Sequence, residues 1–507
     1  MTIISEQKSF FSQRKWATWF VPLFIIGLGL LLRFVDLTDP PLDFNPTRQL
    51  RAAIIARGIY YSHLEDFPLE NKPNAIRFAD QMSVYEPTIF EHLVAWTYLL
   101  VGDEKLWIAR IIAILFWCIG SIGLFGLANE IFGVDGAIVA LGFYQFLPFG
   151  VFASRSFQPD PLMVVGIIFT TWALYRWSLT RAWIYAVWTG LIGGFTILIK
   201  AGGVFFIGAM VIAVILTGRG LRKNIADKKF WLIAGLIIVQ PAIYYLMTIG
   251  KKSASLFTNW TLVLAHLWLS PSFYMRWLIR LDSLIGLFVF FLGLIGVILI
   301  KGKAKPLLIG YWFGYGLFGL AFPHQITTHD YYHLALIPLL ALSLASIGKI
   351  LFSKAVSLEK IWQVVLVGVL IIGITYPIWM ARSILVGQDY RAEPVFWKQV
   401  GEAIPADGKA IALSQDYGHR LMYYGWRKVS CFPNSAQQNL SELRGNTGKD
   451  FYEMFQEKTK GYDYFVVTSL NQLNKQPLLK SILQENYPAL KQGDGFVIYD
   501  LRHPEKD

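Results

Sequence analysis

The stretch WATWFVPLFIIGLGLLLRF, residues 16–34, indicates the fold class of this chain. Its length is close to the about 20 apolar residues that an α-helix needs to cross a bilayer. Lys8, Arg14 and Lys15 precede it. A cleaved signal peptide has a shorter apolar region, followed by a cleavage site of small residues. The sequence therefore predicts an uncleaved first transmembrane helix with a cytoplasmic N-terminus.

Further apolar runs follow along the chain and predict about eleven transmembrane helices in all. We expect the later spans near residues 106–127, 136–153, 161–178, 183–199, 202–217, 231–249, 284–300, 306–322, 333–349 and 361–380. The loops at 218–230 and 301–305 are rich in Lys and Arg. Short cytoplasmic loops carry such an excess of basic residues, so both loops are predicted to be cytoplasmic.

Composition supports a membrane protein. The 507 residues are 55% hydrophobic and 16% charged, with 18 Trp, whereas soluble domains carry about 25% charged residues. The net charge of +12 lies largely in short loops, which argues against nucleic acid as a partner. No Walker or dinucleotide motif is present, so the sequence gives no support to a nucleotide cofactor.

The domain organisation predicted from these spans is an all-α polytopic membrane domain, residues 1–380, followed by a small α/β domain, residues 381–507, outside the cytoplasm. Residues 36–105 and 250–283 then form large extracytoplasmic segments. Within the first, 46–61 is predicted to be an interfacial helix and 86–102 an interfacial or re-entrant helix. In the tail, strands are expected at 409–414, 464–468 and 496–501, and helices at 420–426, 449–460 and 471–485.

Two aspartates stand out beside the predicted spans. Asp43 lies in LDFNPTRQ, just after the first span, and Asp160 lies in SRSFQPDPLM, before the fourth. Asp43 has a structural alternative as a turn residue, and Asp160 as a helix cap before Pro161. Both are predicted to lie at the outer surface, where we expect their carboxylates to share one cavity.

Other polar side chains are predicted at the same surface. They are Glu86, Arg155, Lys200, His324, His329 and Asp330. A carboxylate at membrane depth usually faces protein or a wet cavity, and a His/Asp cluster can bind metal or phosphate. Most of them have a structural alternative. Glu86 would lie at the level of the lipid headgroups, His324 and His329 would be solvated histidines in an interfacial aromatic belt, and Lys200 would extend its side chain to the membrane surface. The one-sided distribution favours a site that opens outward.

These segments resemble the GT-C class of membrane glycosyltransferases, which includes protein O-mannosyltransferases, the aminoarabinose transferase of lipid A and the catalytic subunit of oligosaccharyltransferase. The resemblance covers roughly residues 1–340. It rests on Asp43 in LDFNPTRQ, Tyr85-Glu86-Pro87, the SRxxxPD segment 154–160, Lys-Ala-Gly-Gly at 200–203, and HDYYH at 329–333. Two departures are Phe44, where many members have a second acidic residue, and Glu86, where the bacterial aminoarabinose transferases have lysine.

The resemblance implies an enzyme that transfers a sugar from a polyprenyl-phosphate donor to an acceptor hydroxyl on a lipid, glycan or protein. The reaction would take place on the outer side of the cytoplasmic membrane, with inversion and a carboxylate base. Asp43 is the expected base, with Asp160 holding acceptor, base or metal.

The same resemblance suggests how the phosphate is bound. Arg155, Lys200 and His329 are the candidates for contacting it. A divalent metal is an alternative source of positive charge, and Glu86, His324 and Asp330 are the candidate metal or acceptor ligands.

A transporter or flippase of lipid-linked intermediates is the competing interpretation. Such a protein would carry charges near the membrane midplane and inverted repeats. Here the charges lie at span ends, and no repeat is visible in the sequence. A scaffold whose tail binds a partner is the third interpretation, and it leaves the outward-facing acidic residues unexplained.

Overall fold

A computed structural model describes residues 9–13, 15–64, 71–217, 221–248, 255, 258–406, 408–446 and 450–504. Lys8 and Arg14 lie outside these ranges, and so do parts of the segments predicted at 36–105, 218–230, 231–249, 250–283, 449–460 and 381–507.

The chain forms two compact units. The membrane unit comprises 1–37, 84–89 and 109–388, and the tail unit comprises 38–83, 90–108 and 389–507. Most of segment 38–108 is therefore grouped with the C-terminal residues.

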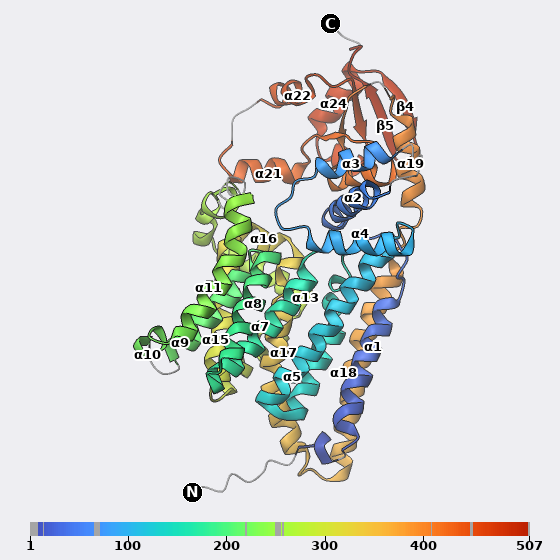
Figure 1. Ribbon diagram of the computed structural model, residues 1–507. Helices are drawn as coiled ribbons and strands as arrows, with labels where there is room; N and C mark the ends of the chain where they lie inside the picture. The colour runs from blue at the N-terminus through green and yellow to red at the C-terminus, as the bar shows by residue number, and fades with distance from the viewer. Residues whose placement is uncertain are drawn as a thin grey trace. The chain divides into compact units, whose positions relative to one another are not determined.

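Helices make up the membrane unit. Their bounds are α1 Ala17–Phe34, α5 Leu106–Phe146, α6 Pro148–Ala153, α7 Asp160–Thr180, α8 Trp183–Ile199, α9 Gly203–Thr217, α10 Leu221–Ile225, α11 Lys228–Ala242, α13 Pro271–Leu284, α14 Leu287–Leu299, α15 Ala304–Ala321, α16 Pro323–Thr328, α17 Leu336–Ala355 and α18 Lys360–Gly387 (Figure 1). Short helical turns η1 Phe11–Gln13, η2 Ile243–Thr248, η3 Thr258–Leu262, η4 Ala265–Leu269 and η5 Asp330–His333 complete it.

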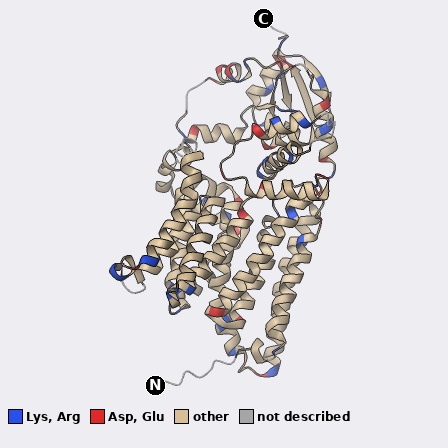
Figure 2. Ribbon diagram, in the orientation of Figure 1, with Lys and Arg blue, Asp and Glu red and all other residues tan. Residues whose placement is uncertain are grey.

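Every predicted span contains helix. In the described part of the chain, six helices are long and apolar enough to cross a membrane, or seven if α13 and α14, bent by 97°, form one span. Figure 2 shows these helices largely free of charge along their lengths, with most Lys, Arg, Asp and Glu near their ends. The chain is thus a mostly helical membrane protein, and the predicted count of about eleven spans stays a prediction.

Helix α5 is two antiparallel segments joined at Gly133. This residue has φ 78° and ψ 178°, a conformation open essentially to glycine alone. The Trp117 and Tyr144 rings stack with centroids 4.2 Å apart, although residues this far apart in a straight helix would be separated by about 40 Å. The chain therefore turns back at Gly133, as the two predicted spans at 106–127 and 136–153 require.

Close packing fixes α7 against α8. A Cβ on Gly166 of α7 would clash with Thr196 Oγ1 of α8, so glycine allows the two backbones to approach. This contact matters for the site because Asp160 begins α7 and Lys200 follows the last residue of α8.

The tail unit has a five-stranded sheet in the order β2-β1-β3-β5-β4. The strands are β1 Ala410–Leu413, β2 Ser430–Cys431, β3 Tyr464–Val467, β4 Ala489–Gly493 and β5 Phe496–Asp500. β1 pairs in parallel with β2 and β3, with Ala410 opposite Tyr464, while β5 is antiparallel to β3 and β4. The predicted small α/β tail is confirmed, including the three strands expected there.

Helices cover both faces of this sheet. They are α19 Glu393–Ala403, α20 His419–Tyr424 with the preceding turn η6 Gln415–Gly418, α21 Ser435–Leu443, α22 Phe451–Thr459, α23 Leu470–Asn474 and α24 Pro477–Asn486. Trp397 and Leu421 pack with one set of strand side chains, and Phe455 and Leu479 pack with the other set.

Three helices from the first loop belong to the tail unit: α2 Pro46–Ser62, α3 Lys72–Asp80 and α4 Ile89–Val101. Leu50, Ile54 and Ile55 of α2 are buried, and α2 packs against α3 and α20. In the tail unit α2 is thus a core helix, and the predicted position of 46–61 at the membrane surface stays a prediction.

Candidate active site

A buried ion pair joins the ends of α7 and α8. Lys200 Nζ donates to Asp160 Oδ1 at 2.5 Å, and the two residues are 7% and 1% exposed. Asp160 Oδ2 is also buried and has no hydrogen-bond partner among the described residues. A buried polar atom left unsatisfied is unusual in a native structure and costs about 1–3 kcal/mol. Asp160 therefore has one carboxylate oxygen bound to the Lys200 ammonium group and one without a described hydrogen bond.

The structural alternative for Asp160 was a helix cap. The cap position is instead Pro159, and Asp160 is the first residue of α7. The hydrogen bond described for its carboxylate goes to Lys200, forty residues later in the chain. The carboxylate thus serves a long-range contact rather than the local backbone.

Two tyrosines lie beneath Lys200. Its Nζ is 4.7 Å from the ring centroid of Tyr331 and 5.6 Å from that of Tyr332. An ammonium group over an aromatic face is attracted by the ring's quadrupole. Lys200 leaves α8 with an extended backbone, φ −153° and ψ 117°. The ammonium group therefore contacts one carboxylate and two aromatic rings.

The HDYYH segment supports this arrangement. The His329 ring lies 5.5 Å from Tyr331 and 6.1 Å from Tyr332, centroid to centroid, and the His324 ring is 6.3 Å from that of His329. His329 is therefore at the edge of the aromatic pair that carries Lys200. Lys200 and His329, two of the residues predicted to contact the phosphate, thus lie beside the same two tyrosines.

Two further contacts fix the same segment. Asp330 Oδ1 accepts a hydrogen bond from Arg280 Nη1 at 2.8 Å. The buried His333 contacts the Tyr315 hydroxyl at 2.7 Å through Nδ1 and the Ile326 carbonyl at 2.8 Å through Nε2. With Nε2 donating to the carbonyl, Nδ1 accepts from the hydroxyl. Asp330 and His333 thus hold the loop that presents Tyr331 and Tyr332.

Arg155 has a different setting. Its guanidinium is buried and donates to the main-chain carbonyls of Arg33, Val35 and Asp36 at 3.2, 2.6 and 2.9 Å. These carbonyls are at the C-terminal end of α1, where the helix dipole is negative. The described hydrogen bonds place the C-terminus of α1 against the Arg155 guanidinium. Its contact with a phosphate stays a prediction.

Glu86 also belongs to the membrane unit. It interacts electrostatically with Tyr245, whose hydroxyl donates to the Leu198 carbonyl at 3.1 Å. Leu198 precedes Lys200 by two residues, so Glu86 lies near the same end of α8. Its role as an acceptor or metal ligand is not decided by this contact.

Asp43 lies in the tail unit, in the loop before α2. It is half-buried, and Gln49 Nε2 is 3.4 Å from Asp43 Oδ1 and 2.7 Å from the Phe44 carbonyl. Asn45 occupies the cap position of α2, with φ 47°, but its side chain makes no capping hydrogen bond. The expectation that Asp43 and Asp160 share one cavity stays a prediction.

A metal site was one alternative for the acidic and histidine residues. Within the described ranges there is no group of three or more His, Cys, Asp and Glu side chains placed to hold a metal ion. Glu86, His324 and Asp330 are not placed as such a group, their role as metal or acceptor ligands stays a prediction, and we derive no step through a metal.

Two arginines of the membrane unit were not among the predicted site residues. Arg280 pairs with Asp330. Arg33 is fully buried in α1 and donates to Ser154 Oγ at 2.7 Å and Gln145 Oε1 at 2.8 Å. An ionisable residue inside an apolar segment was the available signal, because such residues are rare and usually functional or structural.

Comparison with known proteins adds to this geometry. Residues 86–247 match the family model described as dolichyl-phosphate-mannose-protein mannosyltransferase. This segment includes Glu86, Arg155, Asp160 and Lys200. A search of curated proteins finds no significant match.

Solved structures share the fold. The first is ArnT from Cupriavidus metallidurans bound to undecaprenyl phosphate, with 13% identity, TM-score 0.55, and coverage of 94% of this chain and 97% of that one. The second is the archaeal oligosaccharyltransferase AglB from Archaeoglobus fulgidus, in complex with an inhibitory peptide and a dolichol-phosphate. It has 12% identity, TM-score 0.58, and coverage of 96% and 74%.

A structure of the Archaeoglobus fulgidus enzyme in complex with zinc and sulfate matches similarly, with 13% identity, TM-score 0.56, and coverage of 96% and 74%. The similarities extend over nearly the whole chain, including the tail. They confirm the resemblance inferred from the sequence: this chain has the fold of the GT-C membrane glycosyltransferases.

Proposed function

We propose that the chain transfers a sugar from a polyprenyl-phosphate donor to an acceptor hydroxyl on the extracytoplasmic side of the cytoplasmic membrane. The observation that carries the proposal is the buried Asp160–Lys200 pair, with its free carboxylate oxygen and its aromatic support. The GT-C fold supports it, and so do the polyprenyl and dolichol phosphates bound by ArnT and AglB.

Lys200 has the properties needed to bind the donor phosphate. Positive charge on the leaving group stabilises the transition state when the group is preorganised and shielded from water. Asp160 would orient Lys200, and its free oxygen would accept a hydrogen bond from a donor or acceptor hydroxyl. His329 lies beside the same tyrosines and could donate a further hydrogen bond to the phosphate.

The proposed reaction is a single displacement. The acceptor oxygen attacks the anomeric carbon as the bond from that carbon to the phosphate oxygen breaks. The acceptor proton passes to Asp43 as general base, and polyprenyl phosphate leaves with the electron pair. One displacement inverts the anomeric configuration. Asp43 is assigned to this role because the motif around it resembles that of the GT-C enzymes.

The proposal can be tested with purified protein in vesicles containing mixed polyprenyl-phosphate sugars and a cell-envelope extract as acceptor. We expect release of polyprenyl phosphate and a product heavier by one sugar residue, measured by mass spectrometry. Lys200→Met should lose this activity, whereas Lys301→Met, at an exposed lysine in the predicted cytoplasmic loop, should keep it. Movement of intact donor across the vesicle membrane without a new product would instead favour a flippase.

A further inference from the structure

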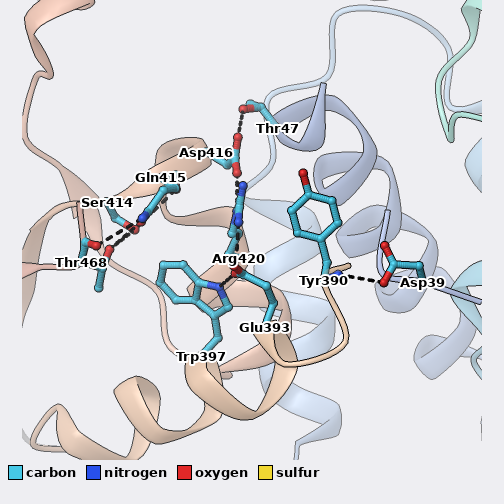
Figure 3. Close-up of polar contacts among 10 residues, drawn as sticks. All are labelled: Asp39, Thr47, Tyr390, Glu393, Trp397, Ser414, Gln415, Asp416, Arg420 and Thr468. Carbon is cyan, nitrogen blue, oxygen red and sulfur yellow. Dashed lines mark hydrogen bonds and ion pairs between the residues drawn. The ribbon is translucent and has the colours of Figure 1, made fainter. Parts of the chain in front are cut away.

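The loop that carries Asp43 is bound at its start to the beginning of the C-terminal segment. Asp39 is 4% exposed, and its Oδ1 accepts a hydrogen bond from the Tyr390 backbone N–H at 2.9 Å (Figure 3). Arg391 Nη1 lies 3.8 Å from the same oxygen. All three residues belong to the tail unit. Residue 39 is consequently fixed by a segment about 350 positions later in the sequence.

The end of the loop is bound by a second part of the tail. Thr47 Oγ1 donates to Asp416 Oδ1 at 2.9 Å, and the Thr47 carbonyl accepts a hydrogen bond from His419 Nδ1 at 3.1 Å. Asp43 therefore lies between two attachments, one at Asp39 and one at Thr47.

The Thr47 attachment is itself rigidly supported. Asp416 Oδ2 accepts from Arg420 Nε at 2.5 Å, and Arg420 Nη1 donates to Glu393 Oε2 at 3.0 Å. Trp397 Nε1 donates to the same Glu393 oxygen at 2.6 Å. Figure 3 shows this chain of contacts running from Trp397 to Thr47. Trp397 is part of the buried core against the sheet, so the core fixes the position of Thr47.

The backbone is strained on both sides of the Thr47–Asp416 hydrogen bond. Asn45 has φ 47°, Asp416 has φ 50° and Tyr417 has φ 56°. Positive φ is uncommon for residues other than glycine. Such residues persist where the surroundings hold them, and they gather at functional sites. Strain at this attachment is consistent with a requirement for one particular loop geometry.

Electrostatic contacts connect Tyr390 to the same loop. Burial raises the pKa of the Tyr390 hydroxyl, Arg420 opposes this, and the carboxylates of Asp43 and Asp39 raise the pKa further. Asp43 is thus close enough to the start of the C-terminal segment to act on Tyr390.

We propose that the appended α/β domain positions the Asp43 loop, with Asp416 and Tyr390 as the positioning residues that hold Thr47 and Asp39. The inference rests on the proposed function, in which Asp43 is the base. Catalysis by a base depends on its alignment with the reacting hydroxyl, and a displacement of about 1 Å can lower the rate about 100-fold. In this proposal the domain acts through Asp43.

The sharpest test is Thr47→Val, which removes one hydroxyl and keeps the shape of the side chain. Turnover should fall about 10- to 100-fold in the wild-type background. In an Asp43→Asn background the same change should have no further effect, because a base that is absent cannot be misplaced. Thr47→Ser, which keeps the hydroxyl, should retain most of the activity.

Thr459→Val is the matched control. Thr459 lies in the same unit, and its hydroxyl donates to the Phe455 carbonyl of its own helix α22. This variant should turn over normally. Equal losses from Thr47→Val in both Asp43 backgrounds would overturn the inference while leaving Asp43 as the base.

Hydrogen exchange tests the attachment independently of activity. Peptides covering residues 39–47 of the full-length protein should exchange faster in Thr47→Val and Asp416→Asn than in wild type. Unchanged exchange there would overturn the inference even if transfer is observed. Faster exchange without any transfer by the wild-type protein would instead overturn the proposed function.

Discussion

Each unit contains an ion pair in which a largely buried basic side chain contacts one carboxylate and two aromatic rings. In the membrane unit Lys200 pairs with Asp160 over Tyr331 and Tyr332. In the tail unit Arg57 pairs with Glu104 at 2.9 Å, and its guanidinium lies 3.6 Å from the ring centroid of Tyr423 and 4.3 Å from that of Trp426. The cations have the same side-chain exposure, 9%, and the carboxylates 2% and 11%.

The two pairs differ in how many of their carboxylate oxygens accept hydrogen bonds. Arg57 Nε donates to both oxygens of Glu104, and the Tyr423 hydroxyl donates to Oε1 as well. Arg57 Nη1 also donates to the Tyr423 carbonyl at 2.6 Å. Asp160 Oδ2, in contrast, has no partner in the described part of the chain. We call the Arg57–Glu104 pair closed, because both carboxylate oxygens are hydrogen-bonded, and the Asp160–Lys200 pair open, because one of its carboxylate oxygens has no described partner.

The largest expected effect is at the proposed base, which belongs to neither pair. Asp43→Asn keeps the size and turn-forming ability of the side chain. Single-turnover transfer should fall by about 10²–10⁴, the usual contribution of a general base, with donor binding largely kept. Wild-type rates in equally folded protein would show that the base is elsewhere, with Glu86 the next candidate.

The open pair should affect activity more than stability. Replacing both charges, as Asp160→Asn with Lys200→Met, avoids leaving one charge buried alone, and such neutral replacements are often tolerated. Transfer should fall by about 10²–10³, with a melting temperature close to that of wild type. Normal turnover in this double variant would mean that the open pair is structural, like the closed one.

The closed pair should behave in the opposite way. Glu104→Gln leaves the buried Arg57 charge without its carboxylate, and should lower the free energy of unfolding by up to about 3 kcal/mol. Thermal unfolding would measure this loss, while turnover per folded molecule should be unchanged. Combining Glu104→Gln with Arg57→Met should recover part of the stability. A large loss of turnover by folded Glu104→Gln protein would contradict a purely structural role for the Arg57–Glu104 pair.

A smaller effect on the free energy of unfolding is expected from pH, through His419 of the tail unit. Burial lowers the pKa of the His419 imidazole below its ordinary value of 6.5, Arg51 also lowers it, and Thr47 and Asp416 oppose the shift. Below pH 6.5 the unfolded chain therefore binds a proton that the folded chain does not, so acid destabilises the fold.

Unfolding measured between pH 5 and 8 should show this decline, and His419→Gln should flatten it. A decline of the same steepness in that variant would assign the pH dependence to other groups. Because Gln can still donate to the Thr47 carbonyl, the variant changes the titration while keeping a donor at that position.

Hydropathy was sufficient to predict where the helices of the membrane unit lie, because each predicted span is an apolar run, while the number that cross a membrane stays a prediction. Asp160 and Lys200 were predicted as separate candidates at the ends of two spans. Their ion pair depends on the packing of α7 against α8, and no periodic pattern in the sequence predicts that packing. Arg155 shows the same limit. The partners described for it are carbonyl groups at the end of α1 and just after it, which no side-chain motif reveals.

Short or exposed elements of the tail escaped prediction for local reasons. β2 contains two residues, and β4, ALKQG, is mostly exposed and polar. The helix expected at 471–485 is divided into α23 and α24 before Pro477, which has no N–H to continue a helix. The attachment of Asp39 and Thr47 to the C-terminal segment joins residues hundreds of positions apart, so only the folded structure brings it to light.

The packing of α2 on α20 sets a condition on the order of biosynthesis. Leu50, Ile54 and Ile55 are buried in the finished protein, but α20 emerges roughly 350 residues after α2. At about 5–20 residues per second, α2 waits roughly 20–70 s for its partner. During that interval the apolar side chains of α2 that contact α20 lack this partner, although α3 follows α2 directly in the sequence.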